Sequence, residues 1–102
     1  MKNKQIELRD FDLAELLDTE EKMIDYLNAE LADGDPHYIK VALKAIARAR
    51  NMSEVVKKSG IPRTTFYRAL SSDSNTGYFT IQKILNALDL HLKVVSNSDV
   101  GN

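Results

Sequence analysis

The chain has 102 residues, 28% of them charged and 43% hydrophobic, which suits one small globular domain with a single core. It has no cysteine, and its two histidines, His37 and His91, are far apart, so disulfides are excluded and no metal-ligand spacing is present. No apolar run approaches the roughly 20 residues of a membrane span and no signal-peptide pattern begins the chain, so a cytoplasmic protein is expected.

Charge is sorted along the chain, although the net charge is only −1. Residues 1–36 hold 4 Lys and Arg against 11 Asp and Glu, whereas residues 37–70 hold 8 against 1. Residues 71–102 hold 2 against 3. A basic block of this kind is typical of a nucleic-acid-binding surface, even where the whole protein is slightly acidic.

The N-terminal third predicts an acidic helical extension. Residues 1–10 are polar and are expected to form a flexible N-terminus, although Ile6 and Leu8 alternate as in a short strand. Residues 11–17 favour one short helical turn with its leucines facing inward. This turn leads directly into a longer helix.

The longer helix is capped by Asp18 or Thr19. Glu20 and Glu21 fall in its first turn, where the helix dipole favours acids, and apolar residues repeat at helical spacing behind them. Its end is expected within 32–36, because a glycine there suits a left-handed cap and a proline cannot continue the helix.

Three further helices are expected in the basic block: from about Pro36 to Asn51, over 53–59 with Ser53 as its cap, and over 62–71. The first combines an apolar face with alanines that allow close packing. Along its opposite edge, basic residues recur at spacings of four: Lys40, Lys44 and Arg48. This stripe would add long-range attraction wherever it faces an anionic partner.

The C-terminal third predicts a loop over 71–77, a last helix capped by Thr80 and a short strand over 90–95, where apolar and polar residues alternate. The tail over 96–102 is expected to be disordered. A lone strand needs a partner for its backbone groups, which either a second subunit or the Ile6–Leu8 segment would supply.

The segment 52–71 has the dimensions of a helix-turn-helix. Gly60 can take a positive φ at the corner between the two helices, and side chains of suitable size fill the angle between them. These side chains are Val56, Ile61, Phe66, Ala69 and Leu70. The expected fold is therefore an all-α bundle of about five helices, with one domain over 11–95 that contains this unit.

The outer face of the second helix in this unit carries hydrogen-bond donors and no acid. Such a face enters the major groove, where arginine pairs with guanine and threonine offers a hydroxyl and a methyl group to base edges. Lysines and helix-terminal amides hold phosphate. The predicted DNA-binding residues are Arg63, Thr64, Thr65, Tyr67, Arg68, Ser53, Lys57 and Lys58. The alternative for each of them is a solvated surface position.

The sequence shows no pattern of catalytic residues. It has no ordered nucleophile–histidine–carboxylate set and no phosphate-binding loop, so neither an enzyme nor a cofactor is expected. The acids of the N-terminal third are expected to form a solvated face rather than a metal site.

Several segments of the chain, taken in order, resemble the probable addiction-module antidote proteins. They are FDLAELL, MIDYLNAEL, GDP, IARARNMSEVVKKSGIPRTTFYRALS and TIQKILNALDLHLKV. These proteins are small antitoxins with a lambda-repressor-like (Xre-type) helix-turn-helix, related to HigA-like antitoxins, and the resemblance covers about residues 11–95. Two departures are Pro62, where the family often has a serine or threonine cap, and Asp89, where a glycine often ends the last helix.

The resemblance implies two partners. One is a small RelE/HigB-like toxin encoded beside the antitoxin, whose ribonuclease activity is blocked on binding. The other is double-stranded operator DNA of the protein's own operon, bound usually as a homodimer. On matching positions, the recognition-helix role falls on Arg63, Thr64, Tyr67 and Arg68.

A toxin that engages RNA is generally basic, so an acidic surface suits its neutralisation. Glu15, Glu20 and Glu21 are the candidate toxin contacts, and the alternative is that they only keep this helix soluble and away from DNA. Two other functions remain open: a stand-alone repressor of prophage type without a toxin partner, and a protein-interaction module that never binds DNA.

Overall fold

The computed structural model describes residues 10–71 and 74–99. Its elements in chain order are α1 Asp10–Leu16, α2 Glu20–Asp33, α3 Pro36–Arg50, α4 Met52–Ser59, α5 Arg63–Ala69, α6 Tyr78–Ala87 and a 3-10 turn Asn97–Asp99. The expected all-α fold is confirmed, and no helix in the described residues has the length and apolar character needed to cross a membrane. The predicted flexible N-terminus lies outside these residues except for Asp10, which begins α1.

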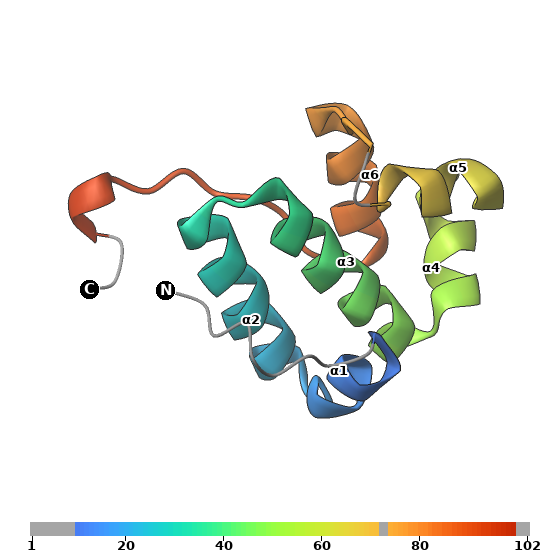
Figure 1. Ribbon diagram of the computed structural model, residues 1–102, viewed down its shortest axis with the longest axis horizontal. Helices are drawn as coiled ribbons and strands as arrows, with labels where there is room; N and C mark the ends of the chain where they lie inside the picture. The colour runs from blue at the N-terminus through green and yellow to red at the C-terminus, as the bar shows by residue number, and fades with distance from the viewer. Residues whose placement is uncertain (1–9, 72–73, 100–102) are drawn as a thin grey trace.

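Helix α3 forms the centre of the molecule (Figure 1). Helix α2 runs beside it, α1 packs near its C-terminal end, and α4 connects it to α5 and α6. The side chains that α3 buries are small or branched, so neighbouring helices approach its backbone closely. They include Ala42, Leu43, Ala45, Ile46 and Ala47, each no more than 1% exposed.

Local sequence rules account for the junctions on either side of α2. The hydroxyl of Thr19 caps the helix by accepting a hydrogen bond from the backbone N–H of Lys22 at 3.1 Å. Asp18 instead accepts from the Lys22 ammonium at 2.9 Å, and this bond lowers the pKa of the Asp18 carboxyl below its ordinary value. Gly34, with φ of 84°, ends the helix in the left-handed conformation, as predicted, and the Asp35 side chain then caps α3.

Two predicted helix starts are wrong. Helix α4 begins at Met52, and its cap is Asn51 rather than Ser53: the Asn51 side chain accepts from the N–H of Glu54 at 3.4 Å. Asparagine tolerates the positive φ of 100° that this tight junction requires. Helix α6 begins at Tyr78 after an extended glycine, so Thr80 lies within its first turn.

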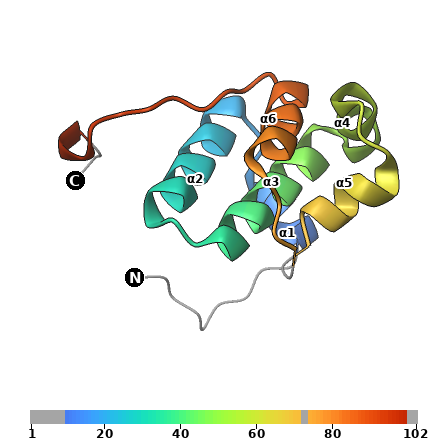
Figure 2. The same ribbon diagram turned by 90° about the horizontal axis from the view of Figure 1, so that it is seen from above.

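The strand predicted over 90–95 is not present, and the described residues contain no strand. After α6 three backbone N–H groups still bond to carbonyls of the helix, and the last of them is Leu90 N–H to the Leu85 carbonyl at 2.9 Å. It then runs as an irregular arm past α2 (Figure 2). Alternating residues form a strand only where a second extended segment lies alongside them. The Ile6–Leu8 segment, one of the two suggested partners, lies outside the described residues.

Candidate functional site

A sharp corner joins α4 to α5. Gly60 has φ of 72°, in the left-handed region, and its N–H donates to the Lys57 carbonyl at 3.3 Å. The buried hydroxyl of Ser59 donates to the Val56 carbonyl at 2.7 Å and accepts from the Ile61 N–H at 3.1 Å. This serine therefore fixes the corner from both sides, a role that the sizes of the apolar residues around the corner do not indicate.

The side chains predicted to fill the angle between the two helices are buried. Phe66 has no exposed surface, and the other members of the set are no more than 8% exposed: Val56, Ile61, Ala69 and Leu70. Helix α5 is shorter than the predicted span of 62–71, and Pro62, which stands where a side-chain cap would be, provides no capping bond. Helix α5 packs mainly against α4, so this apolar wedge sets its direction.

Three of the predicted DNA-binding residues meet at the seam between α4 and α5. Arg63, at the start of α5, donates from Nη2 to Ser53 Oγ at 3.0 Å and from Nη1 to the Tyr67 hydroxyl at 3.4 Å. Its guanidinium carbon lies 5.8 Å from the centre of the Tyr67 ring. All three side chains are exposed, so the guanidinium is held in place while its outer edge faces solvent.

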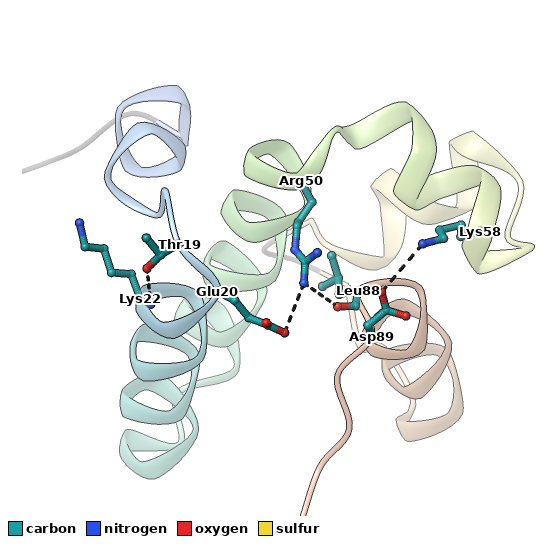
Figure 3. A network of polar contacts seen from close by, with 7 residues as sticks. All are labelled: Thr19, Glu20, Lys22, Arg50, Lys58, Leu88 and Asp89. Atoms are coloured by element: carbon teal, nitrogen blue, oxygen red, sulfur yellow. Dashed lines mark hydrogen bonds and ion pairs between the residues drawn. The ribbon is translucent and has the colours of Figure 1, made fainter.

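The remaining predicted DNA-binding residues lie on the same two helices. Thr64, Thr65 and Arg68 are exposed on α5. Lys57 and Lys58 are exposed in the last turn of α4, and Lys58 Nζ lies 4.0 Å from Asp89 Oδ2 just beyond α6 (Figure 3). Both partners of that pair are more than half exposed, so water screens the attraction and the lysine is readily released.

The predicted toxin-binding acids lie on α1 and α2. Glu15, Glu20 and Glu21 are all exposed. Glu20 Oε2 lies 3.7 Å from Arg50 Nη2, and the same Arg50 nitrogen donates to the Leu88 carbonyl at 3.0 Å (Figure 3). Glu20 therefore takes part in joining α2, α3 and the end of α6. Glu15 lines a groove with Ala14, Arg48, Ala49 and Met52.

The basic stripe expected along α3 does not form a continuous exposed edge. Arg48 is exposed, Lys44 is half-buried, and Lys40 is buried with 7% of its surface exposed. The loop between α5 and α6 supplies oxygen atoms that bind the Lys40 ammonium. Spacing along one helix places these residues on a common edge, but which part of that edge is covered depends on a loop more than 30 residues away.

Residues 7–96 match the family described as "Probable addiction module antidote protein". An uncharacterised protein of Haemophilus influenzae is 43% identical over 88 residues, which cover 86% of this chain and 91% of that relative. No solved structure matches the chain. The family match extends over all six helices and most of the C-terminal arm, so the chain belongs to the family of probable addiction module antidote proteins.

Proposed function

We propose that this protein is the antitoxin of a type II toxin–antitoxin module and that it also binds operator DNA to repress its own operon. In this proposal α4 and α5 form a lambda-repressor-like (Xre-type) helix-turn-helix, as in HigA-like antitoxins, with α5 as the recognition helix. The observation that carries DNA binding is the outer face of α5, whose five exposed residues include two arginines and no acid. The role is non-catalytic and belongs in the cytoplasm, where operator DNA lies.

The seam between α4 and α5 supports base recognition by Arg63. A guanidinium that Ser53 and Tyr67 already hold loses less conformational freedom on binding than a free one. Those two bonds leave further N–H groups for a bidentate contact with guanine O6 and N7. Thr64 and Arg68 follow on the exposed face of the same helix.

Phosphate contacts are assigned to the turn of α4 next to this face. Lys57 and Lys58 are exposed there, and the loose approach of Lys58 to Asp89 is easily exchanged for a phosphate. The backbone N–H of Ser53 lies in the first turn of α4, where helix amides favour an anion. These contacts position the helix on the duplex, and the base contacts give specificity.

Family membership and charge together support a toxin partner. The antidote family implies a toxin to be neutralised, and we assign to it a small basic protein of the RelE/HigB-like type. The three candidate acids on α1 and α2, Glu15, Glu20 and Glu21, are exposed and lie on elements outside the α4–α5 unit. Separate surfaces would let one molecule hold toxin and operator together.

A homodimer is proposed for operator binding. Two recognition helices about 34 Å apart would match successive major grooves of a palindromic site. The C-terminal arm exposes apolar side chains that association would cover, among them Leu92, Val94 and Val95. Sedimentation velocity of the isolated protein should give the mass of two chains at micromolar concentration, and a single species of one chain would contradict the dimer.

The decisive experiment is a gel shift with the DNA directly upstream of the gene, over a series of salt concentrations, with and without the protein product of the neighbouring gene. We expect a specific complex whose log affinity falls linearly and steeply with log salt concentration, because bound lysines and arginines release counterions from DNA. The neighbouring protein is expected to bind the antitoxin and lose its ribonuclease activity.

The outcomes separate the two halves of the proposal. Equal affinity for the upstream duplex and a scrambled duplex would remove specific operator binding. A neighbouring product that neither binds the protein nor loses activity in its presence would remove the toxin half and leave a stand-alone repressor.

A further inference from the structure

Lys40 occupies an unusual position for a lysine. It lies on α3, and only 7% of its surface is exposed, although a charged ammonium is costly to bury without partners. Its Nζ donates to the Ser71 carbonyl at 3.1 Å, to Ser74 Oγ at 3.2 Å and to the Ser74 carbonyl. These acceptors match the N–H groups of an ammonium in number, so the buried charge is satisfied within the protein.

The oxygens bound by Lys40 belong to a polar network that closes the C-terminal end of α5. The carbonyl of Ala69, the last residue of the helix, accepts from Ser74 Oγ at 3.1 Å and from the Thr76 hydroxyl. Ser74 Oγ also approaches the Ser71 carbonyl at 3.0 Å. The last carbonyls of a helix lack partners within it and carry partial negative charge, which hydroxyl donors and a cation offset.

Helix α5 depends on its two ends for its orientation. It has seven residues, too few for an isolated helix to be stable in water. The corner at Gly60 fixes its N-terminal end, and the apolar wedge holds its buried face along its length. The network around Lys40 is the matching anchor at the other end, and it connects α5 to α3, the central helix of the fold.

We propose that Lys40 is a positioning residue for DNA recognition: from α3 it fixes the C-terminal end of α5, and hence the direction of the exposed face that carries Arg63 and Arg68, without touching DNA. This inference rests on the proposed operator binding. It also separates Lys40 from Lys57, which carries the same charge but lies exposed on α4. One lysine acts through helix geometry, and the other acts through a phosphate.

The test compares Lys40→Met with Lys57→Met, which remove the same charge. Methionine keeps most of the length and apolar character of the lysine stem but leaves the carbonyls of Ser71 and Ser74 without the ammonium. Gel shifts over a salt series would measure affinity for the operator and for a scrambled duplex, at a temperature where circular dichroism shows each variant to be folded.

For Lys40→Met we expect at least about tenfold weaker operator binding, with the salt dependence of the wild type and unchanged binding to scrambled DNA, because phosphate contacts are retained. For Lys57→Met we expect the slope of log affinity against log salt to fall by about one, with both duplexes affected. A smaller slope or an equal loss on both duplexes for Lys40→Met would overturn the inference, since the first indicates direct contact and the second general destabilisation.

A milder variant covers the case in which Lys40→Met does not fold. Ser74→Ala removes the hydroxyl that donates to the Ala69 carbonyl and retains every charge, so it should lower operator affinity about threefold to tenfold with an unchanged salt slope. Wild-type operator affinity in Ser74→Ala and in any folded Lys40 variant would overturn this inference but leave the proposed function standing. Failure of the wild-type protein to bind the operator would instead overturn the proposed function, and this inference with it.

Discussion

At the scale of single residues, the polar side chains around α5 are of two kinds: some face solvent, and others have their hydrogen-bonding groups satisfied inside the protein. Arg63 is held by Ser53 and Tyr67 but stays exposed, whereas Lys40 has its charge fully bound inside the protein. Both are basic residues of the same block of sequence. What distinguishes them is burial: the loop after α5 supplies acceptors that enclose the Lys40 ammonium, whereas Arg63 keeps part of its guanidinium in solvent and so stays available to a partner.

Arg63→Lys is expected to lower operator affinity by about 10- to 100-fold, because an ammonium cannot form the planar bidentate contact with guanine. Ser53→Ala should have a smaller effect, about threefold, since it removes only the bond that holds the guanidinium in place. Gel shifts against operators with single base-pair changes would measure both. Lys22→Ala, on α2, is the control and should bind as the wild type does.

If Arg63→Lys kept full affinity and full discrimination at every base pair, base recognition by Arg63 would be wrong. The seam between α4 and α5 would then be a structural feature of the corner, with Tyr67 and Ser53 stabilising the helix pair rather than preparing a contact.

At the scale of elements, short helices joined by tight corners depend on a few backbone positions. Gly34 and Gly60 adopt positive φ of 84° and 72°, and each ends a helix that the next one follows within a few residues. A β-carbon at Gly60 would meet no atom within 4 Å beyond its two chain neighbours, so space does not require glycine there. The requirement is conformational, because a left-handed backbone is unfavourable for residues with a β-carbon.

Gly60→Ala is therefore expected to destabilise the protein by about 1 kcal/mol through backbone strain alone. In a domain of this size the melting temperature should fall by roughly 5 °C in a thermal unfolding experiment. Gly60→Asn should cost less, because asparagine tolerates the left-handed region better than alanine. Equal melting temperatures for the alanine variant and the wild type would show that the corner relaxes to another conformation.

At the scale of the whole molecule, the sorting of charge along the sequence becomes a division between elements. The acidic third forms α1 and α2, and the basic block forms α3, α4 and α5. Among the described residues, the ion pair between Glu20 and Arg50 joins these two parts, whereas Lys58 pairs with Asp89 beyond α6. Because Glu20 pairs with Arg50, a substitution at Glu20 would change a contact within the fold as well as any contact with the toxin. Glu20 is therefore less suitable than Glu15 and Glu21 for a test of toxin binding.

Charge reversal of Glu15 and Glu21 together is expected to weaken toxin binding by about tenfold or more, since it replaces attraction to a basic partner with repulsion. Operator affinity should not fall, because neither residue belongs to α4 or α5. Calorimetry with the purified toxin and gel shifts with the operator would measure the two effects in the same variant. Unchanged toxin affinity would place the toxin-binding surface elsewhere.

The local features of this protein follow from its sequence. Helical periodicity and the left-handed glycines depend on residues within a few positions of one another, and the buried wedge around Phe66 lies within the single segment 52–71. These features can therefore be recognised from the sequence. The separation of acidic from basic residues follows from their order along the chain. The exposure of the α5 arginines follows from their positions on the helix face opposite the apolar residues. Sequence alone does not select the cap of α4, because Ser53 offers an oxygen as suitable as that of Asn51 and only the backbone path decides between them.

Tertiary structure decided what depends on segments far apart in the chain. Lys40 shares a predicted edge with Lys44 and Arg48, but the loop after α5 covers it and binds its ammonium. The alternating residues of 90–95 have strand character, yet the described part of the fold places no second strand beside them. Burial of a charge and pairing of a strand both require a distant partner, and residue order along a single element does not specify where that partner lies.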